Sequence, residues 1–94
     1  MPLKARALER GLLRKGFRVV ESRHRQYRYY KMNGGRTTVQ TLASHGSGRD
    51  IGDHRLGQMA RQLKLTRRQF DQLVDCSLSQ PDYEAMLRRG GFIR

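Results

Sequence analysis

Apolar side chains recur at helical spacing in the first fifteen residues. This spacing predicts a helix over residues 5–15, ended by Gly16, with a buried stripe formed by Ala5, Leu8, Leu12 and Leu13. Arg6, Arg10 and Arg14 follow one another four residues apart on another side of the same helix. Because like charges in such a row repel, the row weakens the helix unless an anion lies against it. A solvated face is the alternative interpretation.

After Gly16 the pattern changes to short runs rich in β-branched and aromatic residues. These runs predict three strands, over residues 17–21, 25–32 and 36–42. Asn33-Gly34 is a strong hairpin signal, because both residues tolerate the positive φ of a tight turn. We therefore expect a three-stranded antiparallel sheet, followed by a loop over residues 44–48.

Helical spacing returns in the second half of the chain. Asp53 is expected to cap a helix over residues 54–64, and Thr66 with Gln69 forms a capping box for a helix over residues 67–75. Ser79 to Asp82 starts a last helix, which Gly90-Gly91 end. The predicted fold class is α+β, with the order α-β-β-β-α and two further short helices. Residues 1–65 are expected to form the functional domain, and residues 66–94 a helical extension packed on it.

Strand parity divides the second strand between two faces. Tyr27 and Tyr29 point toward the helices, whereas His24 and Arg28 share the opposite, solvent-facing side. Tyrosines interleaved with arginines are typical of a base-stacking platform. At least two of them are expected in the core, because the chain has few large apolar side chains. Tyr30 is the best candidate for stacking.

The charge of the chain narrows the choice of partner. Its 94 residues carry 20 Lys and Arg against 8 Asp and Glu, a formal net charge of +12. Residues 1–36 alone hold eleven Lys or Arg and two Glu. Such a balance favours nucleic acid, with an acidic protein or an anionic membrane surface as alternatives. Arginine outnumbers lysine, which favours planar, bidentate contacts to phosphate.

The sequence gives little evidence for a disulfide, a metal site, nucleotide hydrolysis, acyl transfer or a membrane-spanning segment. The single cysteine, Cys76, excludes an internal disulfide and a cysteine-based zinc site. His24, His45 and His54 could in principle bind a metal, but no cysteine is near, and Asp50 and Asp53 are better explained as caps or loop anchors. We therefore expect no metal and no cofactor. Motifs for nucleotide hydrolysis and acyl transfer are missing. The chain has no apolar stretch of membrane-spanning length and no apolar leader, so we expect a soluble, cytoplasmic protein.

His24 is the candidate for catalysis. It lies at the entrance of the second strand beside Arg23, Arg25 and Arg28, and neighbouring cations favour its neutral form. A neutral imidazole acts as a general base or acid near neutral pH, for example on an RNA 2′-hydroxyl. The arginines would hold the phosphate and offset its developing charge. A surface histidine without a catalytic role is the alternative.

Four segments carry a family resemblance: Leu12–Phe17, Ser22–Arg25, Thr37–Val39 and His45–Ile51. Together they resemble the HicA toxin family of small mRNA interferases, over residues 5–65. The resemblance implies a double-stranded-RNA-binding-domain-like fold and metal-independent, ribosome-independent cleavage of mRNA. It also implies a catalytic histidine at the start of the second strand, the position of His24 here, and neutralisation by a HicB-type antitoxin.

The chain departs from the family pattern at several positions. Ser22 and Arg25 stand where the family has a glycine and a second histidine, Gln40 replaces a proline, and residues 66–94 extend past the minimal domain. We expect an endoribonuclease toxin of a type II toxin–antitoxin system, with His24 catalytic. The expected RNA contacts are Arg23, Arg25, Arg28, Arg18, Lys31, Tyr30, His45 and Arg49.

Two other functions stay open. One is a non-catalytic RNA-binding protein on the same fold, in which His24 only contacts phosphate. The other is an adaptor whose basic face docks an acidic protein, with a contact surface on the last helices made of Phe70, Leu73, Val74 and Tyr83. These four residues alternatively enlarge a thin core.

Overall fold

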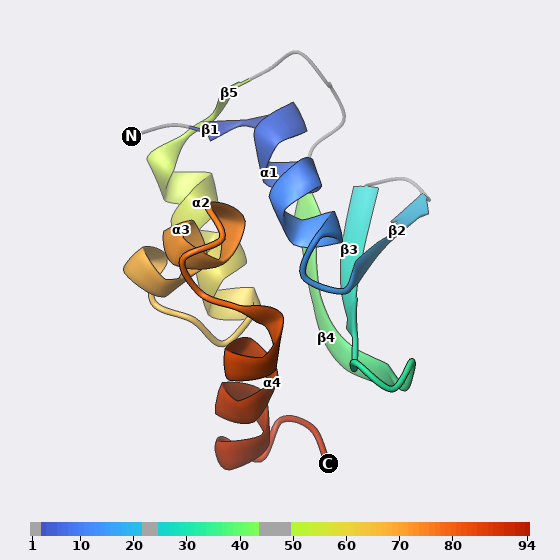
Figure 1. The fold of residues 1–94 in the computed structure, drawn as a ribbon. Coiled ribbons are helices and arrows are strands. Elements are labelled where there is room, and N and C mark those ends of the chain that lie inside the picture. Colours follow the sequence, from blue (N-terminus) through green and yellow to red (C-terminus); the bar gives the residue numbers. More distant parts are fainter. Residues whose placement is uncertain (1–2, 22–24, 44–49) are drawn as a thin grey trace.

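The computed structural model describes residues 3–21, 25–43 and 50–94 (Figure 1). The predictions for Arg23, His24, His45 and Arg49, and for the loop over 44–48, lie outside these residues. In chain order the elements are β1 (Leu3–Lys4), α1 (Ala5–Leu13), β2 (Phe17–Glu21), β3 (Arg25–Tyr30), β4 (Arg36–Ala43), β5 (Asp50–Ile51), α2 (Asp53–Gln62), α3 (Arg67–Val74) and α4 (Gln80–Arg89).

The predicted three-stranded antiparallel sheet is confirmed, with the strand order β2-β3-β4. Arg18 of β2 lies opposite Arg28 of β3, which in turn lies opposite Gln40 of β4. The β3–β4 turn closes where Gly34 donates its backbone N–H to the Lys31 oxygen at 2.7 Å, and Gly34 has a φ of +89°. The turn begins after Tyr30, so β3 is two residues shorter than predicted.

A second, two-stranded sheet was not predicted. In it β1 pairs with β5, with Leu3 opposite Ile51 and Lys4 opposite Asp50. The pairing brings the start of α1 beside the start of α2. Each strand has only two residues, so neither carries an alternating pattern that a sequence could reveal.

The four helices lie where they were predicted, with differences at their ends. The cap of α2 is Gly52 rather than Asp53, because Asp53 already has helical geometry and occupies the first turn. The capping box of α3 is present, with the Thr66 hydroxyl accepting from the Gln69 N–H. Helix α2 ends at Gln62 instead of Lys64, since Lys64 adopts a left-handed φ of +66° that no helix continues.

The helices gather on one side of the three-stranded sheet and enclose the core with it (Figure 1). Phe17, Tyr29 and Tyr83 form an aromatic cluster at the centre, with ring centroids 5.2 to 5.9 Å apart. Phe70, Leu73 and Tyr83 of α3 and α4 are fully buried in the same core as the residues of α1 and the sheet. They therefore enlarge the core, and the exposed contact surface suggested for them is wrong.

Two charged side chains are buried where α3 and α4 join the rest of the fold. The Lys15 ammonium donates to the Leu73 oxygen at 2.8 Å. The Glu84 carboxylate accepts from the Tyr29 hydroxyl at 2.7 Å and from the Met32 N–H at 2.8 Å. Burial alone would raise the pKa of Glu84, but these bonds and Arg88 outweigh it and hold that pKa below its usual range. Both contacts tie residues beyond Leu65 to α1 and the hairpin.

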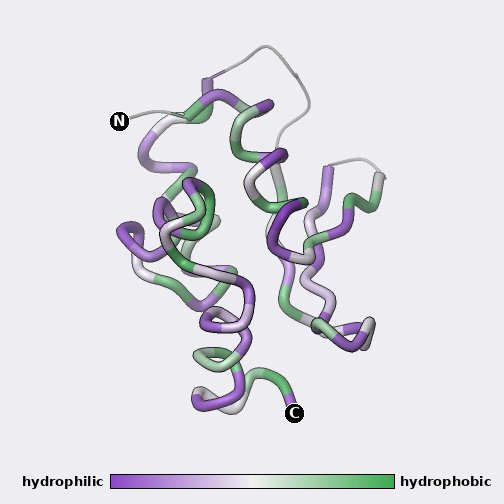
Figure 2. Tube along the Cα trace, in the orientation of Figure 1, coloured by the Kyte–Doolittle hydropathy of each residue, from purple (hydrophilic) through white to green (hydrophobic). Residues whose placement is uncertain are grey.

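Hydrophobic and hydrophilic residues alternate at short intervals along the helices (Figure 2). This alternation is what helices with one buried face require. In the part of the chain that the structure describes, every helix is too short or too polar to cross a bilayer.

Candidate nucleic-acid interface

The sheet presents one face to the helices and the other to solvent. Phe17, Val19, Tyr27, Tyr29 and Val39 point toward the helices and are buried or partly buried. The alternate side chains form what we call the outer face, and every one of them is at least partly exposed. Its members are Arg18, Val20, Gln26, Arg28, Tyr30, Arg36, Thr38, Gln40 and Leu42. Three of these nine residues are arginines and none of the nine is acidic.

Two of the three arginines of the outer face are held by neutral partners. Arg28 donates to the Gln40 side-chain oxygen from Nε at 3.3 Å and from an Nη at 2.9 Å. Arg18 lies over the Tyr30 ring, with its guanidinium carbon 4.0 Å from the ring centroid. Neither partner neutralises the charge of its arginine. The outer face is therefore positive and partly preorganised.

Arg25 lies on the other face of the sheet. Its Nε is 2.8 Å from a carboxylate oxygen of Glu9 on α1, and the Tyr27 hydroxyl donates to the same oxygen at 3.1 Å. Burial first, and the Glu9 charge second, raise the pKa of Tyr27 to about 12. The structure thus separates Arg25 from Arg28, contrary to their grouping in one phosphate-binding set, and gives Arg25 an acidic partner.

The other predicted RNA contacts within the described residues are Arg18, Lys31 and Tyr30. Arg18 is exposed, while Tyr30 and Lys31 are half-buried at the turn end of β3. Tyr30 belongs to the outer face, as strand parity predicts, whereas Tyr27 and Tyr29 are core residues. Of the predicted contacts in these ranges, the structure therefore gathers Arg18, Arg28 and Tyr30, with Lys31 at the edge.

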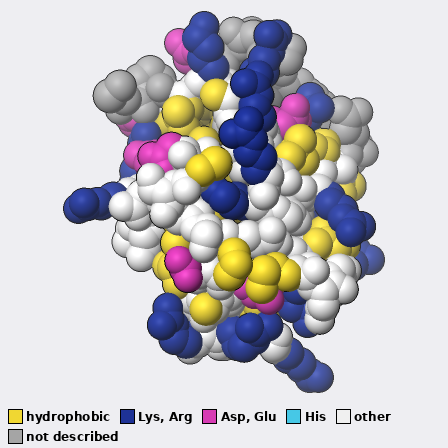
Figure 3. Space-filling view, in the orientation of Figure 1, with side chains coloured by type: hydrophobic (Ala, Val, Ile, Leu, Met, Phe, Trp, Pro, Cys, Tyr) yellow, Lys and Arg dark blue, Asp and Glu magenta, His cyan; other side chains and the backbone are white. Residues whose placement is uncertain are grey.

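A second group of arginines lies on α1 and just after it. Arg6, Arg10 and Arg14 are all exposed. Figure 3 shows a file of Lys and Arg side chains down the upper part of the molecule, in the region of α1 in Figure 1. Among the described contacts, none pairs these three arginines with a carboxylate. Solvent or a bound anion must therefore screen the repulsion among these three arginines.

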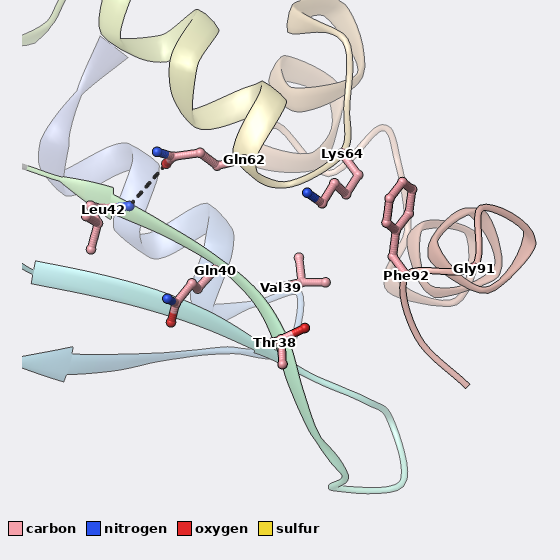
Figure 4. A pocket seen from close by; sticks show the side chains of 8 residues that line it. All are labelled: Thr38, Val39, Gln40, Leu42, Gln62, Lys64, Gly91 and Phe92. Carbon is pink, nitrogen blue, oxygen red and sulfur yellow. Dashed lines mark hydrogen bonds between the residues drawn. The ribbon is translucent and has the colours of Figure 1, made fainter.

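The structure also contains a groove that the sequence did not reveal. It has a volume of about 520 Å³ and runs along β4, between Gln40 and Thr38 on one side and Lys64 and Phe92 on the other (Figure 4). Phe92 is 47% exposed. The sequence offered no separate signal for this groove, because an apolar residue such as Phe92 commonly follows the left-handed glycine that ends a helix, here Gly91.

Among residues 3–21, 25–43 and 50–94, no group of three or more His, Cys, Asp or Glu side chains lies close enough together to hold a metal ion. Comparisons of the chain with protein-family models, with curated proteins and with solved structures give no match.

Proposed function

We propose that this protein binds RNA through the outer face of its sheet. The observation that supports this most is the set Arg18, Arg28 and Arg36 beside Tyr30, with no carboxylate among the described residues of that face. Guanidinium groups bind phosphates through paired N–H donors, and an adjacent aromatic ring stacks on an unpaired base. Among the described contacts, Gln40 uses only part of the Arg28 donor set, so donors remain for a phosphate.

We further propose that the protein is a HicA-like endoribonuclease toxin acting in the cytoplasm. This proposal rests on the motif resemblance and on the order of α1, β2, β3, β4 and α2, which suits a double-stranded-RNA-binding-domain-like core. In it, His24 takes the proton of a ribose 2′-hydroxyl, and the freed oxygen attacks the adjacent phosphorus. The imidazolium returns a proton to the departing 5′-oxygen, which leaves a 2′,3′-cyclic phosphate.

The partner in this proposal is a HicB-type antitoxin. A chain with a net charge of +12 attracts an acidic protein by the same long-range field that attracts RNA. The antitoxin would cover the outer face and exclude RNA from it. An acidic protein encoded beside this one, whose co-expression restores growth, is the expected finding.

The test separates binding from cleavage. Purified protein is incubated with end-labelled mRNA, and products and bound fraction are measured for wild type, His24→Ala and His54→Ala. His54 is a matched control, because it is an exposed histidine on α2, away from the outer face. Cleavage that only His24→Ala abolishes supports the toxin. Binding with intact RNA in all three leaves the non-catalytic RNA-binding protein, and the absence of binding contradicts both.

A further inference from the structure

The groove along β4 is the middle one of three connected hollows. A second, of about 450 Å³, shares Gln62 and Lys64 with it and continues along α2. A third, of about 200 Å³, shares Phe92 and leads to the β3–β4 turn. Neighbouring hollows thus share lining residues, which places the three in a row. We call this row the β4 groove.

The lining of the β4 groove is strongly cationic. Among the residues that the structure describes, no Asp or Glu lines any of its three parts. Six basic residues do: Lys31, Arg36, Arg55, Arg61, Lys64 and Arg94. Cations arranged in a row match a polyanion, whose negative charges are regularly spaced. They match a small anion less well.

Phe92 stands at the junction of the middle and third parts. Its backbone N–H donates to the Leu87 oxygen at 3.0 Å, so its position is held although nearly half of the side chain is exposed. The Lys64 ammonium lies 5.2 Å from the centroid of its ring. Figure 4 shows the Lys64 and Phe92 side chains next to each other, with the Lys64 side chain extending toward β4. An exposed ring beside a cation is the arrangement that stacks an unpaired base and binds its phosphate.

The backbone at Lys64 is left-handed. Lys64 has a φ of +66° at the second position after α2, where glycine is common. Cys76 has the same conformation after α3, with a φ of +74°. This geometry therefore ends two helices of the fold and does not by itself distinguish the groove.

Two glutamines provide polar groups inside the groove. The side-chain oxygen of Gln62 accepts from the Thr41 hydroxyl and from the Leu42 N–H at 3.4 Å (Figure 4). The Gln40 oxygen accepts from Arg28. With its oxygen engaged, Gln62 keeps its amide N–H donors for an incoming ligand, whereas the Gln40 side chain points toward β3 in Figure 4. Such donors match the carbonyl and ring-nitrogen acceptors of a nucleobase.

From these contacts we infer that the β4 groove binds a segment of single-stranded RNA, with one base stacked on Phe92. The phosphates on either side of that base lie against Lys64 and Arg61 in one direction and Arg36 in the other. The inference rests on the proposed RNA binding and adds that the bound strand is unpaired at this point. In a duplex, the bases are stacked on one another and cannot reach the ring.

The substitution Phe92→Trp gives a direct measurement. The chain has no Trp, so the Phe92→Trp protein carries a single indole whose fluorescence a stacked base quenches. We expect saturable quenching by a single-stranded RNA oligonucleotide and little by a duplex of the same length. Ser77→Trp is the control, since Ser77 is exposed and is not among the groove residues; its indole should not respond.

Binding by side-chain variants completes the test. Phe92→Ala should weaken binding of the single strand roughly 5- to 150-fold, the range for one lost stacking contact. Phe92→Ala should not weaken binding of an oligonucleotide made only of abasic sites. Lys64→Gln should weaken binding more than Arg68→Gln, which removes the same charge from an exposed site on α3 outside the groove.

The two proposals fail in different ways. If wild type binds RNA but the indole of the Phe92→Trp protein is not quenched, the groove inference is wrong and the proposed function stands. If wild type binds no RNA, both are wrong.

Discussion

Arg18 of β2 and Tyr30 of β3 lie face to face on the outer side of the sheet, 4.0 Å from guanidinium carbon to ring centroid. Their contact resolves a conflict in the strand register, which sets Arg18 directly opposite Arg28. Like charges opposite one another destabilise a sheet. Here the Arg18 guanidinium lies over the Tyr30 ring, and the Arg28 guanidinium donates to the Gln40 side-chain oxygen. The sheet thus keeps two neighbouring cations at its surface, each held by an uncharged side chain.

Arg28→Ala should weaken RNA binding and lower the salt dependence. Each lost phosphate contact reduces the slope of log K against log salt concentration by about 1. Binding is measured by fluorescence anisotropy at several salt concentrations, with Arg68→Ala as the matched exposed arginine on α3. Equal losses in the two variants would mean that only net charge matters and that the outer face has no special role.

Tyr30→Ala and Tyr30→Phe separate stacking from other roles of the ring. Tyr30→Phe keeps an aromatic face for the base and for Arg18, so RNA affinity should change little. Tyr30→Ala should cost about 1–3 kcal/mol of binding free energy, the value of one base–aromatic contact. The same anisotropy assay measures both. Unchanged binding by a folded Tyr30→Ala protein would remove Tyr30 from the interface.

Gly11→Ala tests the close approach of α1 to α3. A Cβ at residue 11 would lie 2.5 Å from the Val74 oxygen and 2.9 Å from its Cα, both backbone atoms that cannot rotate away. We expect a loss of roughly 1–3 kcal/mol in the free energy of unfolding by urea. Gly57→Ala on α2 meets nothing within 4 Å and should instead stabilise by up to about 1 kcal/mol. A stabilised Gly11→Ala protein would show that this packing is wrong.

Glu84 makes the stability depend on pH in a predictable direction. Its pKa is held below the ordinary value of 4.5 in the folded protein, so folding favours the carboxylate. This contribution is fully present above about pH 4.5 and is lost as the pH falls through the lower, folded pKa. The difference in unfolding free energy between wild type and Glu84→Gln should therefore shrink from pH 7 to pH 3. A constant difference would contradict the buried carboxylate.

The sequence predicts the local elements well because each has a local cause. The Asn33-Gly34 turn, the capping box at Thr66 and the alternation from Phe17 to Tyr30 each lie within a few residues. The β1–β5 pair could not be foreseen, since it joins segments almost fifty positions apart through two residues each. For the same reason the sequence did not show that Phe92 and Lys64 meet at the edge of β4.

The candidate site was predicted in part. Strand alternation placed Arg28 and Tyr30 outward and Tyr27 and Tyr29 inward, as found. Arg25 was grouped with Arg28 by nearness in sequence, although their odd spacing puts them on opposite faces, and Glu9 binds Arg25 from α1. The burial of Glu84 depends on partners from the hairpin more than fifty residues away, which no local pattern reveals.

The salt dependence of RNA binding by the wild-type protein tests whether its surface arginines bind phosphate groups. If phosphates bind the arginines of the outer face and the β4 groove, log K should fall linearly with log salt concentration, with a slope of about −2 or steeper. His24→Ala should give the same slope, because catalysis is not needed for binding. A slope near zero, or RNA binding too weak to detect at low salt, would contradict phosphate binding by these arginines.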